Sequence, residues 1–159
     1  MRNRDVLRIW GGLSKITDKK NTKFSFVVLR NKKLLKDVVE SLKTIQVQKV
    51  DGYDDFNEDR LKLCEKYAEK DEHGQPIQVK QGGEFVFKIS NQKEFGDGIL
   101  KLFDLHENYK ENLKQKQKAF DKLLDEDVDI NLIKIDINEL PSDLTESEIS
   151  LIEEIIYEK

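Results

Sequence analysis

Cysteine is nearly absent from this chain of 159 residues. The single thiol, Cys64, has no second cysteine to pair with, which excludes the disulfide-stapled scaffolds typical of small secreted domains. A chain of this length can bury a core without such bridges. The sequence therefore predicts a protein of a reducing cytoplasm, in which Cys64 is a small packing residue.

Proline and long apolar runs are also scarce. The 2 prolines lie outside the long periodic stretches, so proline breaks none of them. No apolar run reaches the roughly 18 residues that a membrane-spanning helix needs, and the beginning of the chain lacks the apolar centre of a signal peptide. We therefore expect a cytoplasmic protein with no membrane partner.

Residues that carry chemistry are few. His73 and His106 are the only histidines, and neither accompanies a nucleophile in a recognisable spacing. Asp125–Asn131 looks like the start of a calcium loop, but Ile130 stands where that loop needs glycine. The sequence thus predicts no catalytic residue, no metal and no cofactor. A pocket that held either histidine against a carboxylate would point back to an enzyme.

Helical periodicity is the strongest pattern present. Apolar residues recur at steps of four and three from Phe24 to Tyr67, and again from Phe95 to Leu123. A repeat of seven is typical of helices that bury one stripe against a neighbour. The sequence therefore predicts two long antiparallel helices that form a coiled-coil hairpin. Gly52 leaves open whether the first of them is continuous.

Alternating apolar residues predict a small sheet between and after these helices. Residues 77–80 and 84–89 alternate on either side of a Gly82-Gly83 turn, which indicates a β-hairpin. Residues 128–137 also alternate, with a change of phase that a β-bulge would produce. We expect these three segments to form one sheet.

Two shorter helices are expected at the ends of the chain. The first spans about 4–16, with Asn3 as its N-cap, and the last starts near Thr145, where Thr145 and Glu148 form a capping box. The predicted fold is therefore mainly helical α+β in a single domain, 1–159. Its expected parts are 1–22 (basic helix and connector), 23–124 (helix, β-hairpin, helix) and 125–159 (acidic strand and terminal helix).

Charge of each sign is gathered in a different part of the sequence. Residues 1–50 hold thirteen lysines and arginines against four acidic residues, whereas residues 121–159 hold three lysines against thirteen acidic residues. The basic part either forms a surface for an anionic partner or pairs with the acidic part. The candidate binding site, called here the N-terminal basic cluster, consists of Arg2, Arg4, Arg8, Trp10, Lys15, Lys19, Lys20 and Lys23.

Five stretches along the chain are distinctive: RNRDVLRIWGGLSKI, TKFSFVVLRNKKLL, LCEKYAEKDEHGQPI, LLDEDVDINLIKID and ELPSDLTESEISLIEEII. In this order they resemble a group of short accessory proteins encoded by bacterial phages and prophages. The resemblance covers most of the chain and implies a small virus-derived protein in the bacterial cytoplasm. The resemblance implies no catalytic residue in this chain. The order helix, β-hairpin, helix also looks like prefoldin-type chaperone subunits, a similarity of architecture alone.

These observations favour a non-enzymatic binding protein of phage origin. It would neutralise a host factor, such as a defence complex, by covering its surface. One alternative is an assembly factor or chaperone for a viral structural protein. A second is sequestration of an anionic signalling nucleotide by the N-terminal basic cluster, with Trp10 stacking on the base. The expected partner is a host or viral protein, and a homodimer would cover apolar flanks that a two-helix stripe leaves open.

Overall fold

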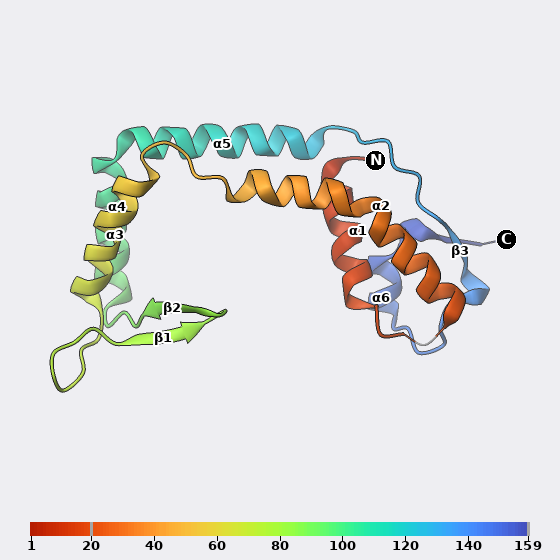
Figure 1. Cartoon of the computed structure of the whole chain (residues 1–159), viewed down its shortest axis with the longest axis horizontal. Helices are drawn as coiled ribbons and strands as arrows, with labels where there is room; N and C mark the ends of the chain where they lie inside the picture. The colour runs from red at the N-terminus through yellow and green to blue at the C-terminus, as the bar shows by residue number, and fades with distance from the viewer. Residues whose placement is uncertain (20, 159) are drawn as a thin grey trace. The chain divides into compact units, whose positions relative to one another are not determined.

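Helices account for most of the structure, a computed structural model that describes residues 1–19 and 21–158 (Figure 1). Within those residues there are six α-helices and two two-stranded sheets, which confirms the predicted mainly helical α+β class. The chain divides into two compact units, whereas the sequence predicts one domain over 1–159. Unit 1 contains residues 1–48 and 119–159, and unit 2 contains residues 49–118.

Unit 1 is built from segments that are far apart in the sequence. Its helices are α1 (Asn3–Lys15), α2 (Thr22–Val47), the last turns of α5 (Glu107–Asp125) and α6 (Glu146–Leu151). Its small parallel sheet pairs β3 (Ile135–Asp136) with β4 (Ile156–Tyr157). Two 3-10 turns, η1 (Ile137–Glu139) and η2 (Glu153–Ile155), connect these elements.

Helix α1 begins one residue earlier than the sequence predicts, because Asn3 has a different partner from the one expected. The Asn3 side-chain amide donates to the carbonyl oxygen of Leu123 at 2.8 Å, which fastens α1 to the end of α5. Arg2 is the N-cap instead, and the Asp5 carboxylate accepts the Arg2 backbone N–H at 3.2 Å. Asn3 is thus a packing anchor and not a cap.

The core of unit 1 follows directly from helical periodicity. Val6, Ile9 and Leu13 recur along one face of α1 and are fully buried. They pack against the buried stripe of α2, which includes Phe24 and Leu35. The C-terminal part of the chain completes this core with Ile135, Ile152 and Ile155. The apolar faces of α1 and α2 therefore need residues beyond position 119 to be covered.

The predicted cap of the last helix is confirmed. Thr145 is the N-cap of α6, its hydroxyl accepts the Glu148 backbone N–H at 3.3 Å, and the Glu148 carboxylate accepts the Thr145 backbone N–H at 2.8 Å. These two bonds satisfy backbone donors that a helix start leaves free. The helix is short, since the chain turns at Ile152 into η2 and then β4.

The segment that precedes β3 is the main error in the predicted sheet. Residues 128–134 form no strand, and residues 135–136 pair with β4 and not with the β-hairpin. Asn31 takes the place of a neighbouring strand. Its side-chain amide donates to the Ile133 carbonyl oxygen at 2.9 Å and its side-chain oxygen accepts the Ile133 N–H at 2.8 Å. The change of phase in the apolar pattern of residues 128–137 therefore does not come from a β-bulge. It occurs in an extended segment that packs along the core.

Unit 2 is an antiparallel helix pair with a β-hairpin between the helices. Its elements are α3 (Tyr53–Tyr67), β1 (Gln78–Gln81), β2 (Glu84–Phe87), α4 (Gln92–Leu105) and the greater part of α5. Strand β1 pairs with β2 in the register Gln78 with Phe87 and Gln81 with Glu84, so the predicted Gly82-Gly83 turn is confirmed. The predicted order helix, β-hairpin, helix is therefore present in unit 2.

Each of the two long helices expected from the sequence is interrupted. The first ends at Val47 and helical structure resumes at Tyr53, after Gly52, which has φ +84° and is the N-cap of α3. This backbone conformation is one that glycine adopts readily and other residues rarely adopt. A Cβ at Gly52 would also lie 3.1 Å from the Tyr109 Cβ. The question that Gly52 left open is thus answered: the periodic stretch from Phe24 to Tyr67 forms two helices, α2 and α3, and not one.

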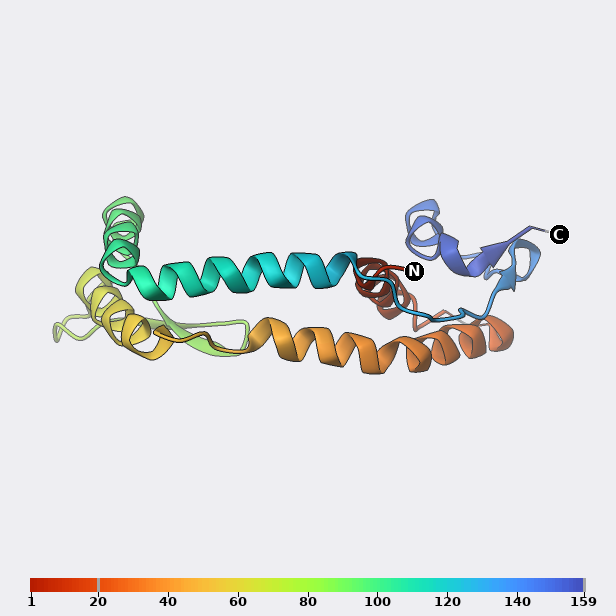
Figure 2. The same cartoon turned by 90° about the horizontal axis from the view of Figure 1, so that it is seen from above.

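The second interruption lies at His106, between α4 and α5, and the two helices meet there at a large angle (Figures 1 and 2). Side chains six positions apart on a straight helix point about 120° away from each other. The bend brings both Phe103 and Tyr109 onto Phe56, with ring centroids 4.7 and 4.5 Å away. The prediction of a continuous helix from Phe95 to Leu123 is therefore wrong. A straight helix could not bring both rings onto Phe56, whereas the bent pair α4 and α5 does so.

Candidate functional site

The N-terminal basic cluster is paired with carboxylates of the C-terminal part of the chain. Arg4 Nη2 lies 2.5 Å and Arg2 Nη1 lies 3.8 Å from Asp125 Oδ1. Arg8 forms an ion pair with Glu154, and its hydrogen bond to that carboxylate raises the pKa of Arg8 above its usual value.

Two lysines of the cluster, Lys19 after the end of α1 and Lys23 in the first turn of α2, pair in the same way. Lys19 Nζ lies 3.2 Å from Glu148 Oε1 and 3.6 Å from Asp143 Oδ2, and Lys23 Nζ lies 2.5 Å from Glu139 Oε1. The hydrogen bond to Glu139 raises the pKa of Lys23. The pKa of Glu148 is lowered, first by the Thr145 backbone N–H that it accepts and also by Lys19.

The remaining members of the cluster do not complete a pocket. Trp10 is half-buried against the core of unit 1, and Lys32 Nζ lies 5.2 Å from the centre of its ring. Lys15 is exposed in the last turn of α1, and Lys20 lies outside the described residues. Arg2 and Lys15 stand at opposite ends of a 13-residue helix, roughly 20 Å apart. The structure therefore favours the second interpretation of the charge division: the basic and acidic parts pair with each other.

Unpaired positive charge is found instead on the solvent side of α2. We call Phe26, Leu29, Arg30 and Lys33 the outer face of α2, because they lie opposite its buried stripe. Phe26 and Leu29 expose 59% and 64% of their side chains. Neither Arg30 nor Lys33 has an ion-pair partner among residues 1–19 and 21–158. The outer face thus joins exposed apolar area to two free cations.

Sequence reasoning missed the outer face, although the necessary signal was present. Positions 26, 29, 30 and 33 follow helical spacing and fall between the apolar positions of the heptad. A large apolar residue between core positions of a surface helix is a candidate for contact with a partner. The basic residues nearest the N-terminus drew attention because they are densest there, but density does not show which cations have partners.

His106 does face a carboxylate, which is the arrangement that would point back to an enzyme. His106 Nε2 lies 3.1 Å from Asp59 Oδ2, and the ring meets Phe56 edge-on at 5.7 Å. Asp59 also accepts from Lys62 at 2.9 Å, and these two hydrogen bonds, Lys62 first, lower its pKa. The contact fixes the bend between α4 and α5 to α3. A cavity of about 350 Å³ that His106 lines with Asp55 is open to solvent.

The other candidate reactive groups have ordinary structural surroundings. Cys64 is buried, burial raises the pKa of its thiol, and Arg60 Nη1 lies 3.9 Å from its sulfur. A raised pKa keeps the thiol protonated and unreactive near neutral pH. His73 is an exposed turn residue beside Glu72. Within the described part of the chain, no three histidine, cysteine, aspartate or glutamate side chains are placed to hold a metal ion.

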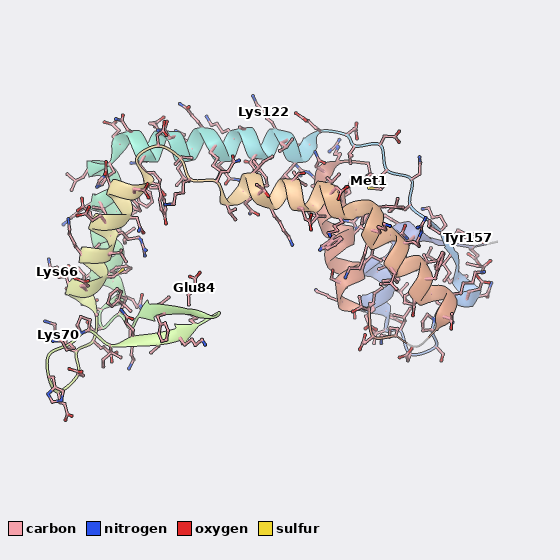
Figure 3. All side chains as sticks on the ribbon, viewed as in Figure 1. Met1, Lys66, Lys70, Glu84, Lys122 and Tyr157 are labelled. Carbon is pink, nitrogen blue, oxygen red and sulfur yellow. The ribbon has the colours of Figure 1, made fainter. Side chains whose placement is uncertain are left out.

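A groove of about 450 Å³ runs between α3 and α4 in unit 2. Leu63 and Tyr67 line it from α3, and Leu102 and Leu105 line it from α4. Leu105 exposes 80% of its side chain. Charged residues of both signs border the groove, among them Lys66, which Figure 3 labels. The groove is apolar at its floor and charged at its rim, as surfaces that receive another chain commonly are.

Comparisons with protein-family models, with curated proteins and with solved structures found no match to this chain. None of the helices in residues 1–19 and 21–158 is both long enough and apolar enough to cross a membrane. Arguments about function therefore start from the surfaces described above.

Proposed function

We propose that this chain is a non-enzymatic binding protein of phage origin that neutralises a host protein by covering its surface. The outer face of α2 is the contact surface, and its partner presents an acidic patch with an apolar centre. The observation that carries the proposal is the combination of exposed Phe26 and Leu29 with unpaired Arg30 and Lys33 on one helical face.

The chemistry of this face suits a protein partner. Full burial of a leucine or phenylalanine side chain contributes roughly 1.5–3 kcal/mol, part of which offsets the entropy lost on association. Arg30 can form bidentate hydrogen bonds with a carboxylate, and two free cations speed the encounter with an acidic surface. Arginine and aromatic side chains are the residue types most enriched where binding energy concentrates.

The nucleotide alternative finds less support. It needs cations from the N-terminal basic cluster to converge beside Trp10 on one anion. Arg8, Lys19 and Lys23 each pair with a carboxylate of the same unit, and Trp10 lies half-buried under Lys32. An anionic ligand would have to displace those carboxylates before it could bind.

Affinity capture from a bacterial host lysate tests the proposal, with proteins identified by mass spectrometry. The test variant is Arg30→Glu with Lys33→Glu. The control is Lys114→Glu with Lys118→Glu, which makes the same charge change at two exposed helical positions of α5 that have no ion pair among the described residues. We expect the wild type and the control to capture the same protein, and the test variant to lose at least tenfold of it.

The captured protein must also meet a chemical condition. It must carry an acidic surface, and its binding must weaken as salt is raised, because charge pairs at an exposed face are screened. Equal capture by the test variant and the wild type would overturn the assignment of the outer face of α2. Recovery of this chain alone, in repeated captures, would overturn the protein-partner function itself.

A further inference from the structure

We propose that the groove between α3 and α4 receives a second copy of this chain, so that two copies associate through unit 2. This inference is independent of the proposed function, which concerns the outer face of α2. It starts from the four apolar side chains that line the groove, Leu63, Tyr67, Leu102 and Leu105. Leu105 is 80% exposed, more than any other large apolar side chain in the described part of the chain.

The charges at the rim identify the occupant. Asp97 and Lys101 lie one turn apart on α4, on the side that borders the groove. Neither has an ion-pair partner among residues 1–19 and 21–158. The groove lining as a whole carries two charges of each sign, since Glu94 and Lys66 also border it. A rim that carries both signs can be complementary to itself when one copy is turned by 180°. A purely acidic or purely basic partner would leave the charges of its own sign opposed.

The same rotation also fills the groove. If α4 of one copy lies antiparallel to α4 of the other, with the two-fold axis near position 99, Asp97 of each copy faces Lys101 of the other. Leu105 then falls opposite position 93, at the end of α4 that packs near Tyr67. That end is confirmed by the Tyr67 and Phe95 rings, whose centroids are 6.3 Å apart. Each copy thus places its most exposed leucine over the other copy's tyrosine.

The size of the surface sets the expected strength. Helix α4 has 14 residues and is about 21 Å long, so the shared surface is at the small end of specific protein interfaces. We expect a reversible dimer with a dissociation constant on the order of tens of micromolar. Sedimentation velocity over a range of roughly 5 to 500 µM, on the full chain, measures it.

Leu105→Glu should abolish the dimer, because it places a charge over an apolar floor. Leu100→Glu is the matched control, since Leu100 is also on α4 and 65% exposed but does not line the groove. We expect at least a tenfold weaker association for the first variant and an unchanged constant for the second. Circular dichroism confirms that both remain helical.

A charge exchange tests the two-fold arrangement itself. Asp97→Lys and Lys101→Asp should each prevent self-association, because each places like charges opposite one another at both positions. A mixture of the two variants should associate again, since every contact in the mixed dimer is then between opposite charges. The Arg30→Glu, Lys33→Glu variant should dimerise as the wild type does, which separates this inference from the proposed function.

Two results would overturn the inference. One is a chain that stays monomeric across the whole concentration range. The other is a dimer that Leu105→Glu leaves intact, or that the mixture of exchanged variants fails to restore, because copies would then meet through a different surface.

Discussion

At the scale of single residues, Asn31 organises a segment that has no regular structure of its own. It is fully buried, and its side chain satisfies both backbone polar groups of Ile133. A buried backbone N–H or carbonyl without a partner costs more than the net gain of the bond that would satisfy it. The amide side chain of Asn31 therefore supplies the hydrogen-bond donor and acceptor that a neighbouring strand would supply to residue 133.

Asn31→Ala should lower the free energy of unfolding of unit 1 by about 2–4 kcal/mol, because two polar groups of Ile133 lose their partners. Asn138→Ala is the control, since Asn138 is exposed and, among the described residues, its side chain bonds only to Asp136. It should change stability by no more than about 0.5 kcal/mol. Urea unfolding followed by circular dichroism measures both. A cost for Asn31→Ala as small as the control's would show that water satisfies Ile133.

Sequence reasoning at this scale succeeded for two local features, although the equally local N-cap predicted at Asn3 was wrong. The Thr145–Glu148 capping box and the Gly82-Gly83 turn are settled by neighbours within a few residues, and both are present. It could not give the partner of Asn31, which fills one step of the apolar pattern of α2. The partner of Asn31 is 102 positions away in the sequence, and no spacing rule reaches that far.

At the scale of helices and strands, the helices and the β-hairpin were predicted as the right kind of element, but the two long helices were predicted with the wrong length and residues 128–134 form no strand. Helical periodicity continues through Gly52 and His106, but α2 ends at Val47, before Gly52, and α4 ends at Leu105, next to His106. The heptad pattern predicts only which side chains are buried. Whether one straight helix or two bent ones buries them depends on Phe56, which contacts residues on both sides of the second bend.

The contact between α1 and α6 gives a prediction at the same scale. A Cβ at Gly12 would overlap the backbone carbonyl oxygen of Leu151, whereas a Cβ at Gly11 would meet nothing within 4 Å. Gly12→Ala should therefore destabilise unit 1 by about 1–3 kcal/mol, because α6 must move away from α1.

Gly11→Ala is the neighbouring control for that contact. It should stabilise the helix by about 0.4–1 kcal/mol, because alanine loses less chain entropy than glycine and meets no obstacle. Thermal unfolding of the two variants distinguishes them by the sign of the change. Two shifts of the same sign would show that α6 does not pack on Gly12 as described.

At the scale of the whole molecule, the uneven division of charge becomes internal pairing in unit 1. The candidate site was the part least predictable from sequence, because composition shows where cations gather but not which of them are neutralised. Arg4, Arg8 and Lys19 were expected to meet a partner, and each has a carboxylate from the C-terminal part. Arg30 and Lys33, two cations without an ion pair among the described residues, did not stand out in the sequence.

This pairing makes unit 1 sensitive to acid. The pKa of Glu148 is lower in the folded chain than its usual value, first because it accepts the Thr145 N–H and also because of Lys19. A lowered pKa contributes stability above the unfolded value, about 4.3, and that stability is lost as the pH falls through the folded value. Glu148→Gln should therefore be less stable than the wild type at pH 7 and nearly equal to it at about pH 3.

Glu146→Gln is the control for this prediction, since Glu146 is in the same helical turn and has no ion pair among the described residues. The difference in melting temperature between Glu146→Gln and the wild type should stay the same as the pH falls. Thermal unfolding at several pH values measures the three proteins. A Glu148→Gln deficit that stays the same from pH 7 to about pH 3 would show that the carboxylate's charge has no part in it.

Unit 1 is assembled from the first 48 residues and from residues 119 onward, with unit 2 between them. During synthesis, the ribosome releases residues 49–118 before Ile135, Ile152 and Ile155 exist. Unit 2 can form its own aromatic cluster on the nascent chain, whereas α1 and α2 must wait with Phe24 and Leu35 uncovered. A chain that stops near position 118 would thus keep an apolar helical surface open, the kind of surface that chaperones and proteases recognise.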